Sequence, residues 1–338
     1  VGLECVSRVL AKIGVTDVHV VEEQAVQDGD FPTCPYPNPE VREALGLGLE
    51  LCEETEADLL FATDPDCDRL GIAVPHGGEY RLLSGNEVGL LLLDMLAEQA
   101  AERGEDLSHR VAVTTVVSAP MADDLARSYG LELRRTLTGF KFIGEQIGLL
   151  ESQGREADFL FGFEESYGYL AGTHARDKDA VVASVLVCEL AAHWKARGLD
   201  LYEAMQRLYA EHGFWASALL SKTYEGPEGA ADMAAIMAGL RANPPAEVAG
   251  LPVDQVIDYA EGAEMPAVNP SDPEPQQLPS ADVLELRLAG GSRAIVRPSG
   301  TEPKVKAYVF AKAATMEGAD SLLASISAEV ESILGGTK

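Results

Sequence analysis

The sequence has few cysteines and no long apolar run, and each shortage excludes a class of protein. Its five cysteines are widely spaced and form no Cys-x-x-Cys or Cys/His pattern, which excludes a disulfide framework and a zinc ribbon. A reduced, cytoplasmic location fits this cysteine usage best. Asp94 interrupts the most apolar candidate, Val88–Leu96, so nothing approaches the roughly 18 apolar residues of a membrane-spanning helix. We expect a soluble protein with no membrane partner.

Basic residues are also scarce. The 338 residues include 26 Lys and Arg against 55 Asp and Glu, a formal net charge of −29. Such a charge repels nucleic acids and anionic membrane surfaces, and we therefore predict no nucleic-acid partner. A small anionic substrate remains compatible with it, provided that basic side chains converge locally.

Hydrophobic residues make up 46% of the chain, enough for a core in each of two or three domains. The first 213 residues alternate between helix and strand patterns. We expect strands at 15–21, 58–63, 110–117, 131–135 and 158–163. We expect one helix that ends at Lys12, helices that begin after Pro39, at Met121 and at Phe140, and helices over 84–103, 179–197 and 201–212. This alternation predicts two mixed α/β domains, residues 1–107 and 108–213.

After Gly213 the pattern changes to a smaller α+β domain, residues 214–338. We expect strands at 215–224, 283–288, 293–296 and 305–310, and helices at 228–241 and 317–334. The Pro-rich stretch 266–279 is typical of a surface loop or a short linker.

Three carboxylates, Asp64, Asp66 and Asp68, directly follow an apolar strand. Oxygen ligands concentrated in one turn are typical of a site for a hard cation. The spacing resembles the start of an EF-hand loop, but Arg69 and Pro75 occupy the positions that require Gly and Glu. A solvated acidic turn is the ordinary alternative. Three carboxylates beside a buried strand repel one another without a cation, which favours a metal site.

The segment Arg297–Lys304 joins two expected strands and combines a guanidinium, two hydroxyls, a glycine and a lysine. These groups favour phosphate binding. Pro, Ser and Gly are also common in ordinary turns, but the flanking basic residues stand out in so acidic a chain.

Three further strand-to-helix loops carry polar groups where α/β folds place ligands. Gly162–Gly168 offers carboxylates and a hydroxyl suited to sugar hydroxyls, and His174–Asp179 adds positive charge. Asp177 or Asp179 could equally be only a helix cap. Lys141 lies at a third such turn. Binding of an anionic substrate by so acidic a chain requires local positive charge. The residues that can supply it are Arg69, Lys141, Arg176, Lys178, Arg297 and Lys304.

Taken in order, these loops resemble those of the α-D-phosphohexomutase superfamily, the phosphoglucomutases and phosphomannomutases. The resemblance covers essentially the whole chain and is carried by Tyr36–Glu40, Asp64–Arg69, Gly139–Lys141, Phe163–Gly168, Arg176–Asp179 and Arg297–Lys304. It implies four domains around a central cleft, of which this chain would hold the second, third and fourth. The first domain, whose phosphorylated serine donates the phosphoryl group, would be missing, since no Ala-Ser-His-Asn-Pro motif occurs here.

The resemblance also implies roles for individual residues. Asp64, Asp66 and Asp68 would hold Mg²⁺, and Arg69, Lys141 and Lys178 would be catalytic. Substrate would be bound by Glu164, Ser166, Arg176, Arg297, Ser299, Gly300, Thr301 and Lys304. Without the phosphoserine as a further ligand, we expect weak Mg²⁺ affinity.

The activity that we expect is that of a phosphoglucomutase, an isomerase that interconverts glucose 1-phosphate and glucose 6-phosphate. The resemblance implies a phosphoserine enzyme and a glucose 1,6-bisphosphate intermediate. Phosphomannomutase and phosphopentomutase activities are alternatives, and so is a sugar-phosphate-binding fragment without catalysis. A metal-dependent phosphatase is a weaker alternative, because Asp68 stands where such an enzyme usually has Thr or Val.

Overall fold

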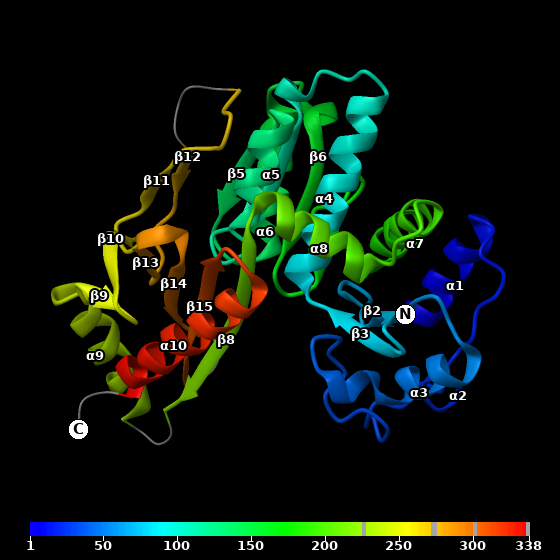
Figure 1. Cartoon of the computed structure of the whole chain (residues 1–338), viewed down its shortest axis with the longest axis horizontal. Coiled ribbons are helices and arrows are strands. Elements are labelled where there is room, and N and C mark those ends of the chain that lie inside the picture. The colour runs from blue at the N-terminus through cyan, green and yellow to red at the C-terminus, as the bar shows by residue number, and fades with distance from the viewer. Residues whose placement is uncertain (225–227, 272–275, 300–302, 336–338) are drawn as a thin grey trace. The chain divides into compact units, whose positions relative to one another are not determined.

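The computed structural model describes residues 1–224, 228–271, 276–299 and 303–335 (Figure 1). The chain forms two compact units. The first comprises Val1–Arg207 and Ala267–Pro273, and the second comprises Leu208–Pro266 and Glu274–Lys338. In the described residues no helix is long and apolar enough to cross a membrane.

The first unit begins with a three-stranded antiparallel sheet, in the order β1-β2-β3. Its elements are α1 (Gly2–Lys12), α2 (Glu22–Ala25), η1 (Arg42–Leu45), α3 (Gly46–Thr55), β1 (Leu60–Thr63), β2 (Leu70–His76) and β3 (Glu79–Leu83). A Gly77-Gly78 turn with positive φ values of 62° and 88° joins β2 to β3. Adjacent glycines of this kind suit the tight turn of a hairpin.

Two expectations for this region were wrong. Residues 15–21 form no strand, since their backbone makes no ladder with any described strand, the edge strand β1 included. β-branched residues favour a strand only where a neighbouring edge accepts their backbone hydrogen bonds. The predicted strand and helix alternation is also replaced by an antiparallel meander, since β2 and β3 were missed. The Gly-Gly signal between two half-apolar runs was present in the sequence.

The second sheet of this unit has the order β5-β4-β6-β7. Its strands are β4 (Val111–Thr115), β5 (Glu132–Thr136), β6 (Phe159–Glu164) and β7 (Gly168–Leu170). β4 runs parallel to β5 and β6, as expected for a βα alternation, and β7 is antiparallel to β6. The accompanying helices are α4 (Gly85–Glu102), η2 (Leu107–His109), α5 (Met121–Tyr129), α6 (Phe140–Ser152), η3 (Glu156–Asp158), α7 (Ala180–Ala196) and α8 (Leu201–His212).

Helices cover this sheet on both faces (Figure 1). Gly89 of α4 lies against the Phe163 ring, so closely that a Cβ would approach the ring to 2.3 Å. On the other face, Ile143 of α6 packs with Val111 and Val113. Burial on both faces explains why β6 is almost continuously apolar. It also brings the carboxyl ends of β4 and β6 beside the start of α4.

The second unit is built on a six-stranded antiparallel sheet, in the order β8-β15-β14-β13-β10-β9. Its elements are β8 (Phe214–Thr223), α9 (Gly229–Ala242), β9 (Glu247–Val248), β10 (Leu251–Asp258), β11 (Ala263–Met265), β12 (Gln276–Leu278), β13 (Leu284–Leu288), η4 (Ala289–Gly291), β14 (Arg293–Pro298), β15 (Lys304–Ala313) and α10 (Met316–Gly335). Alternate residues of the strands face α9 and α10, the period of two expected for a sheet with one buried face. The predicted smaller C-terminal domain is confirmed.

The described residues of the Pro-rich stretch 266–279, which are 266–271 and 276–279, are more ordered than predicted. Val268 pairs with Leu133 by backbone hydrogen bonds, and the Asn269 side chain donates to the carbonyls of Ala126 and Leu131. Further along, β12 pairs with β11. Prolines prevent long strands, but the residues between them still find backbone partners.

Candidate functional site

Asp64, Asp66 and Asp68 lie on the turn that links β1 to β2. Each offers a carboxylate oxygen, and these three atoms lie within 4.8 Å of one another. The turn is fixed from inside, because Asp64 Oδ1 accepts hydrogen bonds from the backbone N–H groups of Asp68 (3.1 Å) and Arg69 (3.0 Å). Cys67 takes a positive φ of 64°, which closes the turn so tightly. The structure therefore brings together all three predicted metal ligands.

The electrostatics of this turn suit a bound cation. Burial raises the pKa of Asp64 to about 6, and the neighbouring Asp68 and Asp66 contribute to the increase. Asp68 Oδ1 is buried and has no hydrogen-bond partner among the described residues. A buried carboxylate oxygen without a partner is costly, and a hard divalent cation satisfies it. The donor set thus fits Mg²⁺.

Arg69 lies over the same turn. Its guanidinium pairs with Glu40 at 3.1 Å, and its Nε lies 3.6 Å from Asp64 Oδ2 and 3.9 Å from Asp68 Oδ1. Three carboxylates therefore surround the one guanidinium. Glu40 belongs to the motif Tyr36–Glu40, for which the sequence predicts no individual residue role. A lone Glu 29 residues away in sequence carries no local signal for this pairing.

Lys178 connects the aspartate turn to the Phe163–Gly168 loop. Its Nζ lies 3.0 Å from Asp68 Oδ2 and 3.6 Å from Glu164 Oε1 and Asp177 Oδ1. Burial opposes the charge of Lys178, but Glu164 and Asp68 outweigh it, so its pKa is raised. Because both Lys178 and Glu164 are nearly buried, this pair holds two loops at a defined separation.

Glu164 ends β6 and is only 3% exposed. Burial raises the pKa of this carboxyl, and Lys178 together with a hydrogen bond from Ser166 partly offsets the increase. The two predicted sugar-binding residues therefore lie close together at the end of β6. A carboxylate and a hydroxyl side by side can bind two hydroxyl groups of a sugar.

Backbone hydrogen bonds tie the two loops together. Leu70 N–H donates to the Tyr167 carbonyl at 3.0 Å, and Ala180 N–H donates to the Cys67 carbonyl at 3.2 Å. Gly168 forms a bridge with Arg69. At this glycine a Cβ would lie 2.5 Å from the Lys178 side chain, so the absence of a side chain allows the close approach.

Two predicted residues of the first unit point elsewhere. The Arg176 guanidinium contacts Glu151 on α6 and the carbonyls of Thr173 and Ala175. Lys141 is exposed, with its Nζ 4.9 Å from the centre of the Phe142 ring, and in the described part of the chain no carboxylate lies within ion-pair distance of it. Both residues remain predictions as substrate or catalytic groups.

The predicted phosphate loop belongs to the second unit. Arg297 lies in β14 opposite Lys306 of β15, and Ser299 N–H donates to the Lys304 carbonyl at 2.7 Å. The strands thus place two basic side chains beside each other and bring the two ends of the loop together. Gly300 and Thr301, predicted to bind substrate, lie outside the described residues.

A second cluster, His76, Asp200 and Glu203, was missed from the sequence. Its donor atoms lie within 4.8 Å of one another, with His76 Nδ1 2.9 Å from Asp200 Oδ2. Its carboxylates have another explanation, since Asp200 and Glu203 each accept the backbone N–H of the other at the start of α8. This is a capping box, and the spacing Asp-x-x-Glu before an apolar helix was a usable signal for it.

Family models match most of the first unit. Residues 1–78 match the model described as phosphoglucomutase/phosphomannomutase, alpha/beta/alpha domain II, and residues 84–212 match alpha/beta/alpha domain III.

Among curated proteins, the chain is 37% identical over 336 residues to a Haemophilus influenzae protein named "Probable phosphomannomutase". That alignment covers 99% of this chain and 62% of the relative. A phosphoglucomutase from Staphylococcus aureus is 36% identical over 308 residues, covering 91% of this chain and 54% of the relative. The chain therefore spans a little more than half the length of the curated relatives that it matches.

Solved structures show the same fold. Parafusin, a phosphoglucomutase from Paramecium in an open form, matches with a TM-score of 0.58 and 19% identity, covering 88% of this chain and 49% of that chain. A phosphoglucomutase/phosphomannomutase family protein from Burkholderia thailandensis matches with a TM-score of 0.56 and 18% identity, covering 91% and 52%.

Proposed function

Because the chain belongs to the phosphoglucomutase/phosphomannomutase family, we propose that it is the sugar-phosphate-binding part of a phosphoglucomutase. The reaction is the interconversion of glucose 1-phosphate and glucose 6-phosphate through a phosphoserine and a glucose 1,6-bisphosphate intermediate. The phosphoserine comes from residues outside this sequence. The observation that carries the proposal is the Lys178 bridge between Asp68 and Glu164, which joins the aspartate turn to the sugar-binding loop.

In this proposal the residues of the first unit bind and orient the sugar. Glu164 and Ser166 form hydrogen bonds, as acceptor and as donor, with two hydroxyl groups of the sugar. They can do so in either orientation of the sugar ring. Arg69 and Lys178 supply positive charge next to a transferring phosphoryl group, where the transition state spreads negative charge over its oxygens. Lys178 is well suited to this because its raised pKa keeps it protonated.

The aspartate turn is the proposed magnesium site, held by Asp64, Asp66 and Asp68. When bound, the cation neutralises phosphoryl oxygens and orients them. Arg297, Ser299, Gly300, Thr301 and Lys304 are proposed to bind the phosphate that does not react, and Lys141 and Arg176 to add positive charge to substrate binding.

A direct test is calorimetric titration of the chain with glucose 1-phosphate, mannose 1-phosphate and ribose 1-phosphate in the presence of Mg²⁺. We expect glucose 1-phosphate to bind most tightly, and no conversion to the 6-phosphate to accompany binding. The role of Glu164 is tested with the variant Glu164→Gln, which keeps the size of the side chain but removes its charge. We expect it to weaken binding by about tenfold, equivalent to one charged hydrogen bond.

Three outcomes would overturn the proposal. Stronger binding of the pentose phosphate would favour a phosphopentomutase, and conversion by the chain alone would show that the phosphoserine is not needed. Stronger binding of mannose 1-phosphate would favour the second candidate, a phosphomannomutase. The 37% identity to the Haemophilus influenzae protein supports that candidate.

A further inference from the structure

Glu165 lies between the two proposed sugar-binding residues, yet its carboxyl points away from them. Its Oε2 lies 3.2 Å from Thr115 Oγ1 and 3.2 Å from Ser118 Oγ, at the turn that follows β4. The Glu165 backbone N–H also donates to Ser118 Oγ at 3.2 Å. Three hydrogen-bond contacts therefore hold one residue of the loop to two hydroxyl groups that are fully buried.

The three side-chain oxygens form a closed triangle, because Thr115 Oγ1 and Ser118 Oγ are themselves 2.8 Å apart. The two hydroxyl groups supply two protons for its three sides. A carboxylate leaves one side without a proton, whereas a carboxylic acid supplies the third, and every oxygen then donates once. The geometry is thus best satisfied by the neutral acid.

The charged surroundings agree with this. Burial raises the pKa of Glu165 to about 7, and the neighbouring carboxylate of Glu164 adds to the increase. The hydroxyls of Ser118 and Thr115 act in the opposite direction. Charged groups around this turn include the ion pair of Arg135 and Asp123 behind it, Lys178 and Arg69 on the far side of Glu164, and Glu87 in the first turn of α4.

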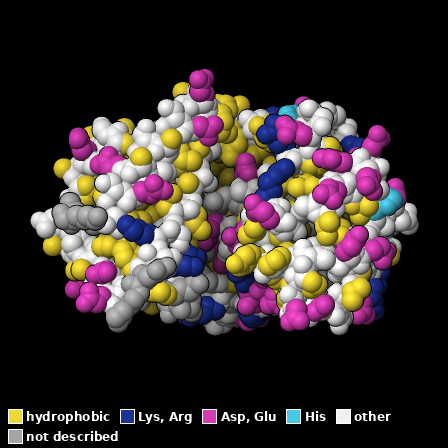
Figure 2. Space-filling view, turned by 90° about the horizontal axis from the view of Figure 1, so that it is seen from below, with side chains coloured by type: hydrophobic (Ala, Val, Ile, Leu, Met, Phe, Trp, Pro, Cys, Tyr) yellow, Lys and Arg dark blue, Asp and Glu magenta, His cyan; other side chains and the backbone are white. Residues whose placement is uncertain are grey.

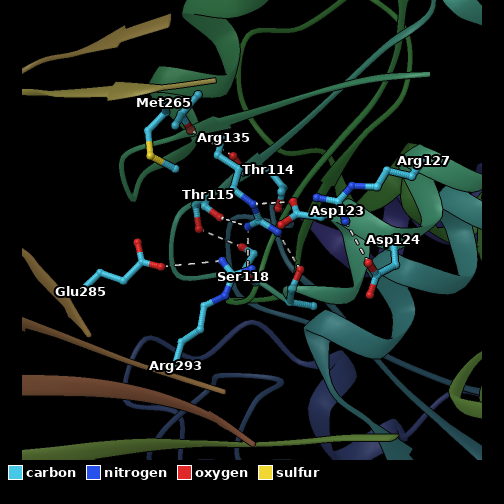
Figure 3. Close-up of polar contacts among 12 residues, drawn as sticks. Thr114, Thr115, Ser118, Asp123, Asp124, Arg127, Arg135, Met265, Glu285 and Arg293 are labelled. Carbon is cyan, nitrogen blue, oxygen red and sulfur yellow. Dashed lines mark hydrogen bonds and ion pairs between the residues drawn. The ribbon is translucent and has the colours of Figure 1, made fainter. Parts of the chain in front are cut away.

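Arg135 holds the turn that carries the two hydroxyls (Figure 3). Its guanidinium donates to the carbonyls of Thr115 (2.8 Å), Ser118 (3.3 Å) and Ala119 (3.0 Å), and its Nε donates to Asp123 Oδ1 (2.8 Å). The side chain is 7% exposed. A planar guanidinium that binds three carbonyls of one turn fixes their relative positions.

The loop is also confined on its backbone side. A Cβ at Gly85, the first residue of α4, would lie 2.3 Å from the Glu165 carbonyl oxygen and 2.7 Å from the Tyr167 nitrogen. The loop around Glu165 is therefore held on two sides, by backbone contact with α4 and by side-chain contact with the turn after β4. Ser166 lies between these two contacts in the chain, next to Glu164.

We propose that Glu165 is a positioning residue, anchored behind its loop so that Glu164 and Ser166 are held in place for sugar hydroxyls. Thr115 and Ser118 form the anchor, and Arg135 fixes the turn on which they lie. This rests on the proposed function for the identity of the ligand, but the anchoring itself is independent of it. The proposal gives a functional role to Glu165, Thr115, Ser118 and Arg135, although none of these four residues contacts the sugar.

The anchoring is tested first without ligand, by following the Ser166 backbone amide in NMR spectra from about pH 5.5 to about pH 8.5. We expect a titration with a midpoint near 7 in the unaltered chain, and none in Glu165→Gln, whose amide cannot ionise. The double variant Thr115→Val, Ser118→Ala should increase the fast motion of residues 164–167. A loop equally ordered in that variant, or an unchanged titration in Glu165→Gln, would overturn the inference.

The positioning role is tested by calorimetry with glucose 1-phosphate and inorganic phosphate as probes. In the double variant we expect about tenfold weaker binding of glucose 1-phosphate, with binding of inorganic phosphate within about twofold, because only the hydroxyl contacts are disturbed. Equal loss for both probes would indicate a merely structural role and contradict us. If the unaltered chain binds no glucose 1-phosphate while its loop titrates as expected, the proposed ligand is wrong and the anchoring stands.

Discussion

At the scale of single residues, the site concentrates charge where water is scarce. Asp64, Asp68, Glu164 and Lys178 are all partly or fully buried around one point. Burying charges costs free energy unless each has a partner of opposite sign. Lys178 and Arg69 between them face five carboxylates, those of Glu40, Asp64, Asp68, Glu164 and Asp177, which leaves the turn with an excess of negative charge. The excess can be measured through the pH dependence of stability.

Replacing Asp64 by Asn should stabilise the metal-free chain at neutral pH. The folded pKa of Asp64 is about 6, against an ordinary value of 3.8, so the folded state binds more protons between these values. The contribution of Asp64 to stability is therefore complete below the lower pKa and is lost as pH rises through about 6. With allowance for solvent screening, we expect Asp64→Asn to gain on the order of 1 kcal/mol at about pH 7.5. Urea denaturation measures this gain.

The matched control is Asp254→Asn, which removes one charge from an exposed position of β10. It should change stability by less than about 0.5 kcal/mol. The gain from Asp64→Asn should shrink at about pH 4.5, where Asp64 of the unaltered chain is protonated. An equal gain at both pH values would show that charge at Asp64 is not the cause.

At the scale of helices and strands, glycines decide how closely the loops approach the helices. Gly85 and Gly89 bring the start of α4 against Glu165 and Phe163. Side chains cap the helices that lead out of the site, as Ser84 and Glu87 do in a capping box for α4, and as Asp179 does for α7. Of the two aspartates that the sequence left open as caps, Asp179 is thus the one that caps the helix.

Replacing Gly85 by Ala should destabilise the first unit, although alanine is the better helix former. Its Cβ would lie within 2.7 Å of two backbone atoms, which cannot move aside as a flexible side chain can. Overpacking of this kind costs about 1–3 kcal/mol. Chemical denaturation followed by circular dichroism gives the size of the effect.

Gly148→Ala is the matched control. Gly148 lies inside α6 and has no heavy atom within 4 Å of the position of an added Cβ. Alanine there should stabilise by about 0.5–1 kcal/mol, because it restricts the unfolded chain and favours the helix. Two effects of the same sign would refute the explanation from close packing.

At the scale of the whole molecule, negative charge dominates. Asp and Glu side chains are spread over the face shown in Figure 2, where Lys and Arg are fewer. With a formal net charge of −29 and a pI near 4.4, the folded chain repels itself at neutral pH. The basic residues that the sequence singled out are thus exceptions to the overall charge.

Added salt should therefore stabilise the chain at neutral pH. Raising NaCl to about 0.3 M shortens the screening length to about 6 Å, which weakens repulsion between distant surface charges. We expect the melting temperature to rise by about 1–2 °C, as for about 1 kcal/mol in a protein of this size. Differential scanning calorimetry measures it, and the same step in salt near pH 4.4 should have a smaller effect. A larger rise near the pI would contradict an origin in net charge.

Short patterns of neighbouring residues in the sequence determined the polar loops of this protein and most of the strands and helices of the second sheet. Three carboxylates after an apolar run predicted the aspartate turn, and the alternation of strand and helix patterns predicted β4, β5, β6 and the helices around them. These signals are local, since a strand followed by a polar turn is encoded in about ten neighbouring residues. The order of the loops along the chain also sufficed to recognise the family.

Only the tertiary structure decided which of these parts meet. Glu40 reaches Arg69, and Glu165 reaches Thr115 and Ser118, over 29 to 50 residues of intervening chain. Such contacts are not encoded locally, as residues 15–21 illustrate by forming no strand despite a strand-like sequence. A strand needs a partner, and an ion pair needs two loops at the same place. The sequence lists the groups, but their proximity is a property of the packed sheets.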